Sequence, residues 1–199
     1  MNDFKNKMNE KINLYSKEEY LDGYIKNEFI TDDGDADIFL NIKDRDELFD
    51  SRTVGDQLDI VNDVFEFIED KTSMLDSDVQ INLHITGYEF DTHDKGVIKH
   101  ILKEHYAIEL YKAQKEYQLI KRKIYKLIVI GLISLLGYLF LYLYTDFNFF
   151  MEVFGFLFSF ALWEGFDSMI YNFSEARKVR EDVCQNLLMN VDFENKKEL

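Results

Sequence analysis

The chain has 199 residues, no proline, a single cysteine and a formal net charge of −15. Its acidity lies almost wholly in residues 1–94, which carry a net charge of −16, whereas residues 95–126 carry +6. This distribution argues against a nucleic-acid surface at the front, because phosphate binding depends on Lys and Arg, and the lone Cys184 excludes an intramolecular disulfide.

Residues 1–94 are predicted to form a small acidic α+β domain. Residues 36–42 and 79–85 alternate between apolar and polar with the period of a strand, and residues 56–70 between them have the apolar spacing of a helix. Further helices are expected at residues 4–15 and 20–25. The first 30 residues contain no apolar core behind a basic start, so no secretory signal is expected and the domain should be cytosolic.

Motifs of catalysis are not recognisable in this domain, and we expect neither an enzyme nor a cofactor. Asp33, Asp35 and Asp37 resemble the start of a calcium loop, but Ile38 replaces the glycine and Asp44 the glutamate that such a loop requires. These three aspartates stay weak metal candidates against the simpler interpretation of a solvated turn. The four histidines do not have metal-ligand spacing.

Residues 95–126 are predicted to form a basic juxtamembrane helical rod, continuous with the segment that follows, so that one helix covers residues 95–144. The apolar stripe of the rod is interrupted by Lys112 and Lys115, so a sustained coiled-coil heptad is not expected. Lys121, Arg122 and Lys123 at its end are expected to contact anionic lipid headgroups.

Residues 127–171 are predicted to form a transmembrane hairpin, with spans at about residues 127–145 and 147–167. The first span has nineteen successive uncharged residues, whereas the second carries acids and could alternatively be a buried helix of a soluble fold. Basic residues precede the first span and follow the second, and none lies in the connection near Asp146. Both termini should therefore be cytosolic, in a plasma membrane of the bacterial inner-membrane type.

Polar and small residues gather on one side of the second span, where we expect protein or water rather than lipid. In a hairpin that turns near Asp146, Lys126 is level with Phe166. Lys126 is therefore expected to partly neutralise the carboxylates of Glu164 and Asp167, which are close to Phe166 in sequence. Gly131, Ser134 and Gly137 offer a small-residue packing face on the first span. The predicted intramembrane polar stripe consists of Glu152, Gly155, Ser159, Trp163, Glu164 and Asp167.

Residues 172–199 are predicted to form a cytosolic helix through Asn190 and a tail that frays from Asp192. The fold class expected for the whole is a membrane protein with a cytosolic α+β domain, a long helix and a two-helix hairpin.

The function that these features favour is that of a non-enzymatic membrane protein. Its hairpin would self-associate into a homo-oligomer, and its cytosolic domain would bind a protein or small-molecule partner. The alternative is an oligomeric pore-forming or ion-conducting effector gated by that domain, since two spans alone cannot enclose a path. Two other interpretations stay open. The polar stripe of the second span could be only the contact between the two helices of one hairpin, or it could serve a proton relay or transport.

Overall fold

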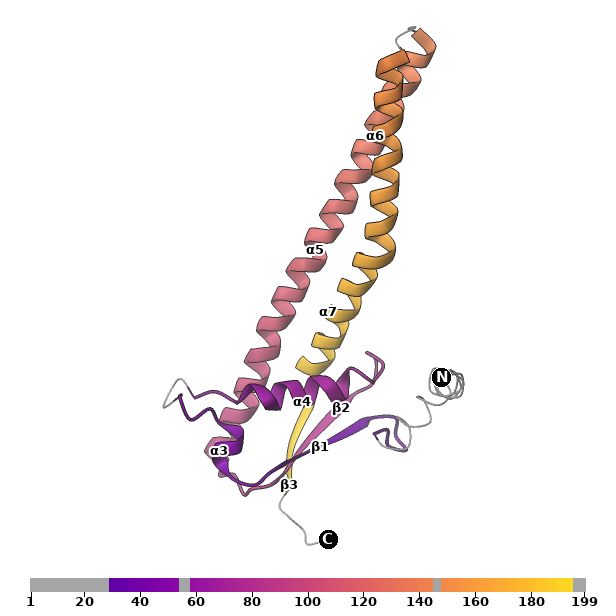
Figure 1. Cartoon of the computed structure of the whole chain (residues 1–199). Helices are drawn as coiled ribbons and strands as arrows, with labels where there is room; N and C mark the ends of the chain where they lie inside the picture. Colours follow the sequence, from indigo (N-terminus) through magenta and orange to yellow (C-terminus); the bar gives the residue numbers. More distant parts are fainter. Residues whose placement is uncertain (1–28, 54–57, 145–147, 195–199) are drawn as a thin grey trace, which may run out of the picture. The chain divides into compact units, whose positions relative to one another are not determined.

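The computed structural model describes residues 29–53, 58–144 and 148–194. The chain is mostly helical and contains one small three-stranded sheet (Figure 1). It divides into two compact units. The first holds the described residues up to Ala107 together with those from Cys184 onward, and the second holds Ile108–Val183.

The sheet of the first unit is parallel, with the strand order β1-β2-β3. β1 (Ala36–Ile42) confirms the strand predicted there, and β2 (Ile81–Gly87) begins two residues later than predicted. β3 (Asn190–Glu194) pairs with β2, placing Asp192 opposite His84 and Glu194 opposite Thr86. The expectation that the chain frays from Asp192 is therefore wrong for Asp192–Glu194, which complete a strand.

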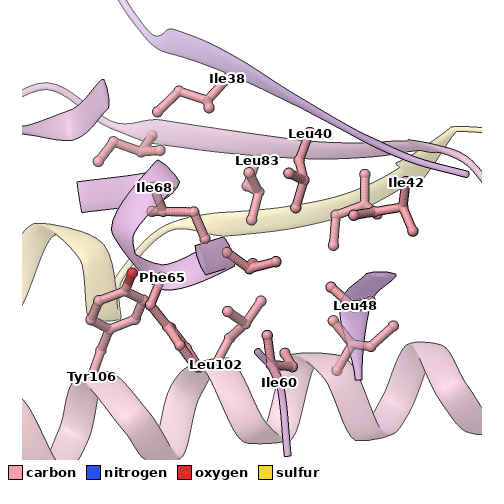
Figure 2. Close-up of a cluster of buried hydrophobic side chains, with 14 of the residues drawn as sticks. Ile38, Leu40, Ile42, Leu48, Ile60, Phe65, Ile68, Leu83, Leu102 and Tyr106 are labelled. Atoms are coloured by element: carbon pink, nitrogen blue, oxygen red, sulfur yellow. The ribbon is translucent and has the colours of Figure 1, made fainter. Parts of the chain in front are cut away.

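One face of the sheet packs on two helices and forms the core. α4 (Asn62–Thr72) begins six residues later than predicted, because Val61 before it is extended and Ile60 bridges to Phe49. Side chains from the strands, α4 and the first turns of α5 (Thr92–Tyr144) converge in Figure 2. The buried residues of this core that Figure 2 labels are Ile38, Leu40, Ile42, Leu48, Ile60, Phe65, Ile68, Leu83, Leu102 and Tyr106.

Two polar contacts fix the chain around β2. Arg45 of the short helix α3 (Arg45–Leu48) donates two hydrogen bonds to the largely buried carboxylate of Asp94 in the first turn of α5, over 3.0 and 3.2 Å. Gly87 ends β2 with a φ of +98°, and a Cβ there would collide with Asn41 and the carbonyl of Ile42. A glycine is therefore required where the chain leaves the sheet for α5.

The connection between β2 and β3 is the unusual feature of the fold. Adjacent parallel strands need a crossover of a dozen or more residues, usually one helix. Here the crossover contains α5, α6 (Asn148–Asp167), the π-helix η2 (Ser168–Asn172) and α7 (Phe173–Leu187) before the chain returns at β3. All helices of the second unit are thus an insertion between two neighbouring strands of the first.

Two helical stretches, Thr92–Tyr144 and Phe149–Leu187, are long and apolar enough to cross a membrane. The prediction of one helix over residues 95–144 is confirmed by α5. Only 11% and 6% of their most apolar windows are buried, unlike the core helix of a soluble protein. The helices predicted at 4–15 and 20–25 and the turn at Asp146 lie outside the described residues.

Candidate functional site

The helical unit is held together by a seam on α5 that repeats every three and four residues. No sustained heptad was expected in the rod at residues 95–126; this seam enters the rod only from Ala113 onward and contains small and aromatic residues as well as aliphatic ones. Two aliphatic residues of the predicted rod, Ile108 and Leu119, lie outside this seam and are exposed. The buried and half-buried members of the seam are Ala113, Tyr117, Ile120, Ile124, Leu127, Gly131, Ser134, Tyr138 and Leu141.

Small residues let α5 and α6 approach closely, and the two helices lie side by side in Figure 1. A Cβ on Gly131 would lie 3.5 Å from the Cβ of Ala161, and one on Gly137 would lie 2.7 Å from the ring of Phe154. Ser134 is buried between these glycines. The structure thus places the predicted small-residue face of Gly131, Ser134 and Gly137 within the hairpin.

The structure separates the predicted polar stripe of α6 into two parts. Gly155 lies in the seam, where a Cβ would be 3.7 Å from the ring of Tyr138. The other part consists of Glu152, Ser159, Trp163 and Asp167, which are exposed. We call these four residues the outer stripe. Because all four side chains are exposed, α5 does not cover them.

Glu164 is half-buried and forms an ion pair at the edge of the seam. Lys123 Nζ donates a hydrogen bond of 2.6 Å to Glu164 Oε1. The sequence pointed instead to Lys126, which forms no ion pair within the described part of the chain. Matching residues by their distance from the turn ignores helix face: Lys123 immediately precedes Ile124 of the seam, whereas Lys126 lies about 160° from Ile124.

The π-helix η2 was not foreseen from the sequence, which carries no proline or glycine there. Ser168 opens η2 and is fully buried, and its Oγ has no hydrogen-bond partner among the described residues. Short π-helices of this kind occur frequently at functional sites.

Two grooves lie along the helices of the second unit. One, of about 250 Å³, is apolar and is lined by Ile124, Leu127, Ile128, Gly131, Leu132, Phe158, Ala161, Leu162, Gly165, Phe166 and Met169. The other, of about 400 Å³, is more polar and is lined by Ala113, Glu116, Ile120, Lys123, Asn172, Glu175, Ala176 and Val179. The first is called the apolar groove below.

The basic residues at the end of the predicted rod do not share one environment. Lys121, Arg122 and Lys126 are exposed and form no ion pair with any described residue. Lys123 is bound to Glu164. Of the three predicted lipid contacts, Lys121 and Arg122 therefore keep their charge available to an anion.

The second face of the sheet is polar and open to solvent along its edge strands. His84 lies between two acids, with Nδ1 3.1 Å from Glu194 Oε1 and Nε2 3.4 Å from Asp37 Oδ1. Asn82 donates a hydrogen bond of 3.1 Å to Asp37, and exposed Phe39 stacks on His84. No element of the described chain covers this face, although parallel sheets are normally covered on both sides.

Of the weak metal candidates, Asp33 and Asp35 lie in the turn before β1, where Gly34 has a φ of +91°, and Asp37 faces Asn82. Across the described ranges no group of three His, Cys, Asp or Glu side chains is arranged to hold a metal ion. Comparison of the chain with protein-family models, curated proteins and solved structures gives no match.

Proposed function

We propose that this chain is a non-enzymatic integral membrane protein. Its α5–α6 hairpin crosses the bilayer with both chain ends in the cytosol and self-associates, while the sheet domain binds a cytosolic partner. The membrane is proposed to be a plasma membrane of the bacterial inner-membrane type.

The exposed apolar surface of the hairpin carries this proposal. Large apolar side chains, Leu136, Phe156 and Ile170 among them, are exposed from Ile128 to Tyr171. Soluble monomers rarely expose a contiguous apolar patch beyond about 600 Å². A hydrocarbon layer about 30 Å thick is matched by roughly twenty helical residues, the length of α6.

The pairing of β2 with β3 supports the orientation. β2 precedes the hairpin and β3 follows it, and the two strands are hydrogen-bonded neighbours. A chain that leaves and rejoins one sheet must cross a membrane an even number of times. The basic residues Lys121, Arg122, Arg177 and Lys178 flank the hairpin on this same side, as the positive-inside rule requires for the cytosol.

The outer stripe supports self-association. In an isolated hairpin Glu152, Ser159 and Asp167 would face lipid, where acids are costly away from the interface. A second hairpin that covers this side would remove them from hydrocarbon. The stripe therefore supports contacts between copies of the chain.

For the cytosolic partner, the open sheet face supplies the best surface. Asp37, Asp192 and Glu194 make it acidic, and the exposed Phe39 adds an aromatic anchor. Aromatic anchors within a polar rim are typical of protein interfaces. The partner proposed is accordingly a protein with a basic surface.

Insertion is tested by flotation of membranes containing the full chain after washing with alkaline carbonate and with urea. We expect the chain to float with the lipid in both washes, because no described part of the chain covers the exposed apolar belt between Ile128 and Tyr171. Release into the supernatant would contradict insertion.

Self-association is tested by cysteine cross-linking in a Cys184→Ser background. Ser159→Cys on the outer stripe should form disulfide-linked dimers in membranes. The matched control is Ile133→Cys, which is also exposed but lies on the other span. Equal cross-linking at both positions would indicate random collision and contradict a specific interface.

A second candidate function is that of an oligomeric pore, which the two exposed acids of the outer stripe favour. In such an assembly Glu152 and Asp167 would line a path for cations. Liposomes containing the chain should then leak potassium, and Glu152→Gln should reduce the flux severalfold. If liposomes that contain a confirmed oligomer do not leak potassium, the pore is contradicted and the non-conducting function remains.

A further inference from the structure

We propose that the apolar groove holds one acyl chain of an anionic phospholipid, whose phosphate is bound by Lys121. This inference rests on the membrane insertion proposed above and specifies one lipid partner of the hairpin.

The groove exists because small residues form its floor. Gly131 and Ala161 are in close contact there, and a Cβ on Gly165 would meet no atom within 4 Å. The rim is made of larger side chains that are exposed on the outside of the hairpin, such as Ile128 and Leu162. The groove therefore opens toward the space that lipid would occupy, and its lining is almost wholly apolar.

The length of the groove matches one leaflet. From Ile124 to Leu132 the lining residues of α5 span about 12 Å at 1.5 Å per residue. Half of a hydrocarbon core about 30 Å thick is about 15 Å. Since Ile124 is at the basic end of the hairpin, the groove runs through the cytosolic leaflet, where an acyl chain would lie along it.

Charge at the cytosolic end identifies the headgroup as anionic. Lys121 is seven residues before Ile128 and eleven before Leu132, so it lies within about 20° of both rim residues on α5. Its ammonium group is exposed, and its stem can extend along the helix to the interface. Arg122 and Lys126 lie about 120° and 160° from Ile128, on other sides of the helix.

The same geometry explains why Lys123 is not the phosphate ligand. Lys123 is paired with Glu164 on the opposite side of the seam from Lys121. That pair neutralises an acid that would otherwise repel a phosphate near the groove. A lipid is favoured over a second hairpin as occupant because the polar residues that require a protein cover lie on the outer stripe.

The test is native mass spectrometry of the full chain in detergent, titrated with phosphatidylglycerol or phosphatidylcholine of identical acyl chains. Gly165→Leu fills the groove, while Gly165→Ala, with similar helix propensity, leaves most of it open. Lys121→Gln removes the proposed ligand, and Lys126→Gln removes the same charge elsewhere. Flotation of each variant is measured first, so that a failure of insertion is separated from a failure of lipid binding.

We expect Gly165→Leu to weaken binding of both lipids by about tenfold relative to Gly165→Ala. Lys121→Gln should weaken phosphatidylglycerol binding about fivefold and weaken phosphatidylcholine binding less, because the choline cation offsets the phosphate charge, whereas Lys126→Gln should preserve the preference. Equal binding by the two Gly165 variants would overturn the groove as the site. Equal effects of the two lysine variants would overturn Lys121 as the ligand, and a Gly165→Leu effect confined to oligomeric state would assign the groove to a second copy.

Discussion

Tyr106 gives a prediction whose sign is opposite to that of most core substitutions. Its side chain is fully buried in the domain core, and its hydroxyl has no hydrogen-bond partner among the described residues. A buried hydroxyl without a partner costs about 1–3 kcal/mol. Tyr106→Phe keeps the ring and removes the hydroxyl, so we expect the free energy of unfolding to rise by about 1 kcal/mol.

The same residue predicts a pH dependence. Burial, with a smaller effect from Glu69, raises the pKa of the Tyr106 hydroxyl above its ordinary value of 10.0. The neutral form is therefore favoured in the folded state. The contribution of this pKa difference to the free energy of unfolding is fully present below about pH 10, the ordinary tyrosine pKa. Above that pH the unfolded chain ionises first, so stability should fall by about 1.4 kcal/mol per pH unit. Tyr106→Phe should lack this loss.

Urea-dependent pulse proteolysis of the full chain in detergent measures both effects, at about pH 8 and about pH 11, on either side of the ordinary tyrosine pKa. Tyr111→Phe is the matched control, since Tyr111 is exposed on the same helix and should change stability by less than about 0.5 kcal/mol. Destabilisation by Tyr106→Phe at the lower pH would show that the hydroxyl has a partner and would refute the reasoning.

Three further predictions test other contacts. Arg45→Gln should lower the free energy of unfolding by about 1–3 kcal/mol, because it leaves the largely buried Asp94 without its two hydrogen bonds; unchanged hydrogen exchange in the first turns of α5 would contradict this. Phe193→Ala should cost about 2–4 kcal/mol by pulse proteolysis and Asp192→Ala less than about 0.5, since β3 turns only the former toward the core; equal costs would refute the strand assignment. Ser159→Leu should shift the oligomer distribution on size exclusion if the outer stripe is an interface, and an unchanged profile would count against it.

The strands and long helices could be predicted because their patterns are local. Alternation in Ala36–Ile42 gave β1 with its bounds, and an unbroken run without proline gave α5. β3 could not be predicted, since five residues carry little periodic signal and their partner β2 is about a hundred residues away in sequence. β3 can be recognised only when its pairing with the edge of β2 is known.

The candidate site was predicted in composition and only partly in arrangement. The small residues Gly131, Ser134 and Gly137 were chosen by spacing, and they do lie where α5 meets α6. The lysine that binds Glu164 was misplaced by three residues, because side-chain reach and helix face decide the pair. The apolar groove could not be predicted from sequence, since it depends on which small residues of two helices face one another.

Labelling of cysteines from each side of the membrane tests the central claim most directly. Native Cys184, the only cysteine, should react with a membrane-impermeant maleimide in inverted vesicles and not in right-side-out ones. A single cysteine at Phe149 in a Cys184→Ser background should show the reverse. Labelling of both positions from one side would contradict a hairpin that crosses the bilayer.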